Sequence, residues 1–477
     1  MNDRLKRLLE KWSAKPTVGA KRNLLIVLVF VVVCAAEGAM FIQTTGPLSI
    51  PDTDLHANSI YAVVTGQEFN PVQGHKDPYG NQVRVQHITG DSRYLFRTGM
   101  HNGMVSDLLE EFHQEASRQN GRHSHASFLS HFLYDKHRVI QESTDRQHAL
   151  TVTIPVKTLT NRSNQYFPIV YAPQALGVWI GMKIGLSPFA NWQLGRITNF
   201  LLFLALYALA IAILPRGKAF LAILGVLPMT VFMASSLMAD ALFISVATLF
   251  VALVLKCAES GGRMGNGALA GLVALTALLV FCKGVYVALA LLVMVLPKKV
   301  LSTKRKIGFV AVSMLVSLPI YGVWSVMFSS TFPNVNVAQN VAYAGKRPVK
   351  IVAMVLYSTL SAFWQNAPKY SFDVMAFVVL IVVWLGYIAY NRRVFKTKKN
   401  ESWIAVYRYA LTSLVILALI LLAIYAIEAL IWNRLYYMGW NDYLMGMEER
   451  YFFPLLPLLL TVAYTDKAAR ADLDYRQ

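Results

Sequence analysis

The chain has 477 residues, a formal net charge of +19 and a hydrophobic content of 56%. Its mean hydropathy of +0.44 lies well above the range of soluble globular proteins, so we expect an integral membrane protein. The basic excess does not indicate nucleic-acid binding, because the longest polar stretch, residues 44–165, holds eleven Lys and Arg against twelve Asp and Glu. The excess lies instead in short segments between apolar runs, which is typical of cytoplasmic loops.

The first apolar run, residues 24–42, follows a basic N-terminal segment, residues 1–23. The run is long enough to span a bilayer. A cleavable signal peptide would have a shorter apolar core followed by small residues, whereas the run ends on the bulky Phe41-Ile42-Gln43. We therefore expect a retained transmembrane helix with its N-terminus in the cytoplasm.

The segment 192–464 is predicted to hold transmembrane helices 2 to 10, threaded so that each basic cluster falls in the cytoplasm. The apolar run 268–296 is basic at both flanks, so we expect a hairpin that turns near Lys283 rather than one tilted helix. The other expected spans are residues 192–214, 220–235, 241–255, 307–328, 372–390, 404–432 and 451–464. The sequence thus predicts an all-α membrane protein of about ten transmembrane helices, with the tail 465–477 also cytoplasmic.

Residues 43–191 then form one large extracytoplasmic loop between helices 1 and 2. Apolar residues recur every three or four positions in 106–116 and 126–140, which predicts amphipathic helices, and 150–156 alternates as a strand does. A mixed α/β loop is therefore expected.

The last part of this loop, residues 166–184, is aromatic and apolar but is interrupted by Pro168 and Pro173. If it crossed the membrane, every later span would invert and the basic loops would face outward. We therefore expect an interfacial helix on the outer surface.

All ten histidines lie in this loop, and the densest group is His123, His125, His131 and His137. The spacing matches no known ligand pattern, because these residues do not share one face of a helix. A solvated histidine-rich surface explains the group better than a metal site.

Six short motifs follow one another along nearly the whole chain. They are Pro51-Asp52 with His56, residues 166–177, Gly195-Arg196-Ile197-Thr198-Asn199, Leu227-Pro228-Met229 through Ser236 to Asp240-Ala241-Leu242, Lys283 to Tyr286, and Arg450-Tyr451-Phe452-Phe453-Pro454. Together they resemble the bacterial membrane-protein family known as domain of unknown function 2142. That family is similar in plan to the GT-C glycosyltransferases, which transfer sugars from polyprenyl-phosphate carriers on the outer membrane face.

The resemblance implies a site at the outer boundary of the membrane. In GT-C enzymes an acidic residue of the first external loop is a catalytic base or a metal ligand, and an Asp follows the third span; Asp52 and Asp240 occupy those positions. The family usually has Glu directly after the Asp of Pro-Asp, whereas this chain has Thr53 and then Asp54. Either Asp52 or Asp54 is therefore the working carboxylate.

Asp52 and His56 each have a catalytic and a structural interpretation. Transfer to a hydroxyl needs a carboxylate that accepts its proton, and Asp52 is our first choice; alternatively, Asp52 only caps a helix that begins near Leu55. His56, one turn later, orients that carboxylate or binds the donor phosphate; alternatively, it is an ordinary surface histidine. A divalent cation held by Asp52 and Asp54 is a minor hypothesis.

The leaving group of such a reaction is a lipid phosphate, so cations are expected at the outer boundary. Arg196, Lys283 and Arg450 qualify, with Tyr451 beside the last. Boundary cations are often simple snorkelling anchors, but Lys283 lies between two short apolar arms that leave it little room. Asp240, flanked by alanines, is a boundary carboxylate of the kind that usually has a function.

We therefore expect a glycosyltransferase that uses a polyprenyl-phosphate-linked sugar to modify or build a cell-envelope glycan. It would lie in the bacterial cytoplasmic membrane with both termini inside. One alternative is a polymerase or ligase that transfers whole lipid-linked oligosaccharides. The other is a polysaccharide or lipid transporter, for which midspan charges, broken helices and an internal repeat are typical; boundary charges and the lack of a repeat favour the enzyme.

Overall fold

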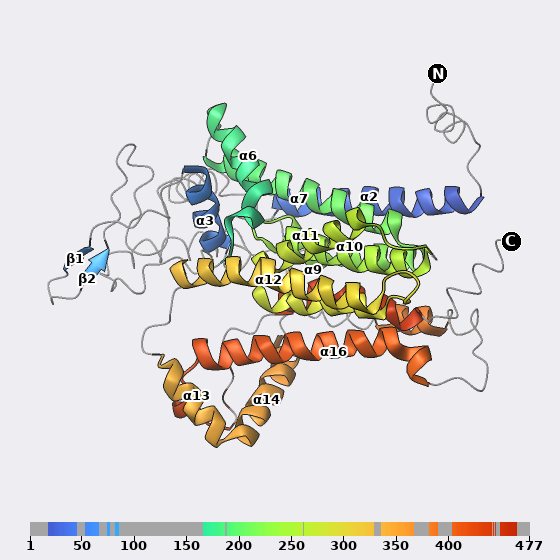
Figure 1. The fold of residues 1–477 in the computed structure, drawn as a ribbon. Coiled ribbons are helices and arrows are strands. Elements are labelled where there is room, and N and C mark those ends of the chain that lie inside the picture. The colour runs from blue at the N-terminus through green and yellow to red at the C-terminus, as the bar shows by residue number, and fades with distance from the viewer. Residues whose placement is uncertain are drawn as a thin grey trace.

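The fold is known from a computed structural model. It describes residues 18–44, 53–65, 74–76, 82–84, 166–186, 188–260, 262–328, 335–366, 381–389, 403–440, 442, 444 and 449–464. These residues are helical for the most part (Figure 1). The exceptions include two three-residue strands of the predicted loop, β1 (Gly74–Lys76) and β2 (Gln82–Arg84), which pair antiparallel with Gly74 opposite Arg84.

Among the described residues, five helices are long and apolar enough to cross a membrane. They run in broadly the same direction through the molecule (Figure 1). The five are α2 (Val18–Thr44), α7 (Pro188–Ile213), α10 (Asp240–Glu259), α12 (Thr303–Phe328) and α16 (Trp403–Ile427). The prediction of a helical membrane protein is confirmed, and the count of ten spans stays a prediction.

Three shorter apolar elements lie among these helices: α11 (Asn266–Cys282) and the 3-10 helices η6 (Gly284–Val295) and η9 (Glu449–Ala463). A 3-10 helix rises about 2.0 Å per residue, so η9 extends about 30 Å, close to the thickness of a bilayer core. The predicted hairpin is present. Lys283 is extended between α11 and η6, and the two far ends meet where Met264 N donates to Val300 O (2.9 Å).

Residues 220–235 differ from the single span that we expected. They form two short helices, α8 (Lys218–Gly225) and α9 (Pro228–Ala234), neither long enough to cross alone. The cause is Pro228, which has no N–H to donate and which disfavours a helical conformation at Leu227 before it. Leu227 is extended, with φ −61° and ψ 129°.

Two helices after α12 were not predicted at all. They are α13 (Val337–Lys346) and α14 (Pro348–Asn366), which meet in a V beside α16 (Figure 1). Of the expected span 372–390, the structure describes residues 381–389, which are helical. The expected helices 106–116 and 126–140 and the expected strand 150–156 lie outside the described residues.

The centre of the bundle is α10, which contacts α7, α11 and η9 and is buried along almost its whole length. Its composition explains this position, because a helix that is apolar on all sides belongs in the interior of a bundle. At one end of the bundle lie α3 (Thr53–Thr65), the 3-10 turn η5 (Pro168–Tyr171) and α6 (Ala172–Lys183), as Figure 1 shows. We call this the loop end.

The opposite end, which we call the basic end, gathers the basic residues that flank the apolar runs. Lys218 Nζ donates to Ile211 O near the end of α7 (2.8 Å), Lys306 Nζ to Met294 O of η6 (3.1 Å), and Arg408 to Val295 O (2.5 Å). These cations therefore satisfy carbonyls that helix ends leave without intrahelical partners.

Candidate functional site

Three charged residues from separate elements lie near one another at the loop end. Asp240 begins α10, Lys283 joins α11 to η6, and Arg450 lies in the first turn of η9. The elements that carry them pack together, since α10 contacts α11, η6 and η9. Asp240 is within electrostatic range of Cys282, as Lys283 is, and of Tyr166, as Arg450 is. We call Asp240, Lys283, Arg450 and Tyr451 the charged site.

Tyr451 is the centre of this site. The Lys283 ammonium lies 2.9 Å from the centre of the Tyr451 ring, and the Arg450 guanidinium carbon lies 5.8 Å from it. Both cations are therefore within the range in which an aromatic face attracts positive charge. The Tyr451 backbone carbonyl accepts a 2.5 Å hydrogen bond from the buried Tyr286 hydroxyl, which fixes the start of η9 against η6.

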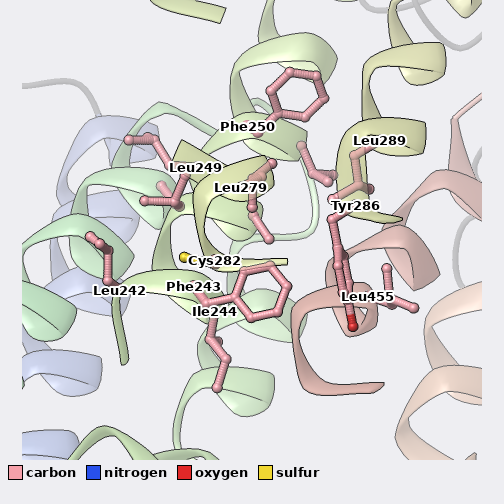
Figure 2. Close-up of a cluster of buried hydrophobic side chains, with 14 of the residues drawn as sticks. Leu242, Phe243, Ile244, Leu249, Phe250, Leu279, Cys282, Tyr286, Leu289 and Leu455 are labelled. Carbon is pink, nitrogen blue, oxygen red and sulfur yellow. The ribbon is translucent and has the colours of Figure 1, made fainter. Parts of the chain in front are cut away.

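The side of the site toward the bundle interior is apolar. The Tyr286 ring meets Phe243 of α10 edge to face, with ring centres 4.3 Å apart. Figure 2 shows Tyr286 with Phe243 on one side and Leu455 on the other, and Cys282 and Leu279 nearby on α11. Arg450 Nη1 lies 3.5 Å from Met238 Sδ. Such surroundings have a low dielectric constant, so the two cations act strongly on any anion that reaches them.

Tyr166 just before η5, Tyr171 within η5 and a histidine of α3 lie over the site. His56 Nδ1 is 2.8 Å from the Tyr171 hydroxyl, and the His56 and Tyr166 rings are 5.2 Å apart. His56 is only 2% exposed, so it is not an ordinary surface histidine. Burial raises the pKa of Tyr166 well above its ordinary value; the neighbouring Tyr451 acts in the same direction, whereas Arg450 opposes it. The Tyr166 hydroxyl is therefore neutral.

The Tyr166-Phe167 segment is held on the ends of α11 and α12. Trp324 Nε1 donates to Tyr166 O (3.1 Å), and Phe167 N donates to Phe281 O (3.2 Å). The Phe167 ring stacks on the Phe281 ring with centres 4.6 Å apart. Residues 166–184, which we expected to form an interfacial helix, are thus attached at their start to the transmembrane bundle, next to Lys283.

A non-helical loop, residues 235–239, delivers Asp240 to the site. Backbone that leaves helical geometry at membrane depth needs partners for its polar groups, because lipid supplies none. Gln174 Nε2 donates to Met238 O (3.0 Å), and Asn199 Nδ2 donates to Ser236 O (2.8 Å) and Met238 O (3.1 Å). Side chains of α6 and α7 therefore set where Asp240 lies.

Arg196 has the same role. Its Nε donates to Ser235 O (2.7 Å), and its two terminal nitrogens donate to Ile42 O (3.1 Å) and Phe41 O (3.0 Å) near the end of α2. The side chain is 2% exposed. This geometry favours a positioning residue that joins α2, α7 and the 235–239 loop. That Arg196 binds phosphate stays a prediction.

The carboxylates of the first motif belong to Asp52 and Asp54. Asp52 lies outside the described residues, and Asp54 lies in α3 with a side chain that is also outside them. Because α3 begins at Thr53, directly after Asp52, the helix expected near Leu55 is present. Whether Asp52 caps this helix or accepts a proton therefore stays open.

No group of three His, Cys, Asp or Glu residues within the described ranges could hold a metal ion. The hypothesis of a divalent cation at Asp52 and Asp54 concerns side chains outside those ranges, and so does the histidine group from His123 to His137.

A family model described as a predicted membrane protein (DUF2142) matches residues 36–459. The chain belongs to this family. The DUF2142 match begins within α2 and ends within η9, so it includes every residue of the charged site. No curated protein and no solved structure matches the chain.

Asp240, Lys283, Arg450 and Tyr451 of this DUF2142 chain were all expected from the sequence. The structure brings Lys283 and Arg450 to the Tyr451 ring and places Asp240 within electrostatic range of the same neighbours, Cys282 and Tyr166. From the sequence, Tyr286 and Gln174 had no expected role, although both stand in the motifs that carried the resemblance. The sequence signal for both residues is a polar side chain within an apolar motif, because a buried polar group needs a hydrogen-bond partner.

Proposed function

We propose that this membrane protein is a glycosyltransferase that takes a sugar from a polyprenyl-phosphate carrier at the outer membrane face and transfers it to a cell-envelope glycan. The observation that carries the proposal is the charged site, where Lys283 and Arg450 share the Tyr451 ring at one end of the bundle. The phosphate of a lipid-linked sugar lies at the membrane boundary, where it would reach the charged site.

The chemistry requires cations where negative charge develops. When the anomeric bond breaks, the phosphate gains charge, and fixed cations in an apolar setting stabilise that charge more in the transition state than before. Lys283 supplies a compact point charge and Arg450 a planar guanidinium, which suits a phosphate with several oxygens. Tyr451 holds both cations at the place where the phosphate would bind.

The acceptor hydroxyl needs a base, and we assign that role to Asp52, with Asp54 as the substitute. The support is that α3 begins one residue after Asp52, and that its His56 packs on Tyr166 and Tyr171 over the charged site. Asp240, within electrostatic range of Tyr166 and Tyr286, shapes the pocket and balances the two cations.

The proposal includes an orientation. The basic end would face the cytoplasm with both termini, and the loop end would face outward from the bacterial cytoplasmic membrane. The basic residues that cap helix carbonyls at one end support this, because cytoplasmic loops carry an excess of Lys and Arg.

The test uses the purified full-length chain in lipid nanodiscs with a panel of radiolabelled polyprenyl-phosphate sugars and a membrane extract as acceptor. We expect transfer by the wild type and a loss of at least about a hundredfold for Asp52→Asn. Both proteins must first show the same thermal unfolding. Equal transfer by both would remove Asp52 as the base, and no transfer with any donor would contradict the proposed donor class.

A transporter remains the second candidate, and one observation favours it. The membrane region contains interrupted helices, at Leu227 between α8 and α9 and again at residues 235–239, as transporters often do. Proteoliposomes that hold a fluorescent lipid-linked sugar on one leaflet distinguish the two functions. Movement to the other leaflet without a new glycosidic bond would favour the transporter.

A further inference from the structure

A second group of cations lies away from the charged site, where α13 meets α14. Lys346, Arg347 and Lys350 follow one another across this bend, and Tyr343 lies one turn before them. We call these four residues the α13–α14 corner. No Asp or Glu occurs in the whole stretch from Val337 to Asn366, so the charge of this segment is entirely positive.

The corner is a built cluster rather than a chance run of basic residues. Arg347 Nη1 and Lys350 Nζ each lie 3.0 Å from the Tyr343 hydroxyl, and their charged groups lie 4.9 and 5.5 Å from the centre of its ring. The hydrogen bond from Lys350 is the main reason why the pKa of Tyr343 is lowered, with Arg347 adding to it. Two cations that converge on one oxygen present a site for an anion.

The corner lies at the loop end of the bundle. Asn340 of α13 donates to Leu430 O (2.9 Å) and Asn433 O (2.6 Å), in the segment directly after α16. The opposite end of α16 carries Arg408 of the basic end. Lys350 Nζ also donates to Met438 O (2.5 Å). The corner is therefore fixed to the bundle at the same end as the charged site.

The faces next to these cations are apolar and exposed. Val337 and Val341 stand one turn apart on α13, and Val349, Val352 and Leu356 form a row along α14, all between 40% and 73% exposed. Tyr437 and Trp440, in the segment that Lys350 contacts, are 74% and 56% exposed. Exposed aliphatic residues beside cations and aromatic rings are typical of a helix that lies in the interface of a membrane.

From this arrangement we propose that the α13–α14 corner binds the phosphate of an anionic phospholipid headgroup, with the acyl chains along the exposed aliphatic face of α14. A free phosphate would use the cations of the corner but not the apolar row, whereas a phospholipid uses both. The proposal does not depend on the glycosyltransferase reaction, because it concerns neither Lys283 nor Arg450.

The test titrates the full chain in mild detergent with fluorescent phosphatidylglycerol or phosphatidylcholine and follows binding by anisotropy. We expect phosphatidylglycerol to bind more tightly, and the double variant Lys346→Gln/Arg347→Gln to weaken it by about fivefold per cation removed. Phosphatidylcholine binding should not change. Lys183→Gln, an exposed lysine at the end of α6, is the matched control and should bind as the wild type does.

Two results would overturn the proposal: equal binding of the two lipids by the wild type, or unchanged phosphatidylglycerol binding by the double variant. Inorganic phosphate is the third arm. If millimolar phosphate displaced the lipid completely, the corner would be a site for free phosphate. A third variant, Val352→Ser/Leu356→Ser, keeps every cation and should still weaken lipid binding, which a purely ionic site would not show.

Discussion

The Lys283 ammonium lies over the face of Tyr451, 2.9 Å from the ring centre, although the two residues are far apart in the sequence. Such contacts are worth about 0.5–2 kcal/mol when the cation is partly desolvated. The contact keeps the half-buried Lys283 oriented at the loop end, where an anion could replace the aromatic face as its partner.

The first prediction concerns this contact. Tyr451→Phe keeps the aromatic face and should retain most of the transfer activity, whereas Tyr451→Leu removes it and should lower transfer by about tenfold. Lys283→Met, which removes the charge but keeps the length, should lower transfer by at least about a hundredfold. Initial rates in nanodiscs measure all three. Full activity in Lys283→Met would exclude this lysine from the reaction.

The second prediction concerns Asp240. If it balances the two cations, Asp240→Asn should leave more positive charge for the donor phosphate, so the KM for the donor should fall. The kcat should fall as well, because the pocket would hold the charged ground state too tightly. Steady-state kinetics separate the two constants. A higher KM with an unchanged kcat would show that Asp240 contacts the donor in another way.

The third prediction concerns Arg196. Arg196→Met leaves several buried carbonyls of α2 and the 235–239 loop without donors, so the free energy of unfolding should fall by about 3 kcal/mol. Thermal unfolding in nanodiscs measures the loss. Lys304→Met, an exposed residue at the basic end, serves as the control and should unfold as the wild type does. A stable Arg196→Met protein that has lost donor binding would instead support the role in phosphate binding.

The fourth prediction concerns the contact of α6 with α7. A Cβ at Gly177 would lie 2.6 Å from Leu194 O and 2.4 Å from Thr198 Oγ1. Gly177→Ala should therefore force the helices apart and destabilise the protein by about 1–3 kcal/mol. Gly271→Ala in α11 is the matched control, since its Cβ meets no atom within 4 Å and the change favours the helix. Equal unfolding temperatures for both variants would contradict the close packing.

Charge placement was the most reliable guide in the sequence. The turn at Lys283 followed from the basic flanks of one long apolar run, because a single span would have put one cluster on the wrong side. Asp240 and Arg450 came instead from the family resemblance and from the cations expected around a lipid phosphate, and their place at a membrane boundary stays a prediction. The hairpin needed only local sequence and the alternation of spans, which explains why it agrees with the structure.

Other features depend on partners that are distant in the sequence. Nothing around Arg196 indicates that its hydrogen-bond acceptors are carbonyls of Phe41 and Ile42, on a different helix. In contrast, Pro228 stands in the sequence itself, and its effect on the conformation of Leu227 could have predicted the break between α8 and α9. The α13–α14 corner was missed because its apolar residues are too few and too interrupted for a span.

The loop at residues 235–239 also restricts how the chain can vary in length. Arg196 and Asn199 reach this loop because they lie three residues apart on one face of α7. One inserted residue between them would rotate the second by about 100° and detach it from the loop. Related proteins should therefore carry few insertions between Gly195 and Asp240, and a gap-free alignment over that interval would identify the members that share this site.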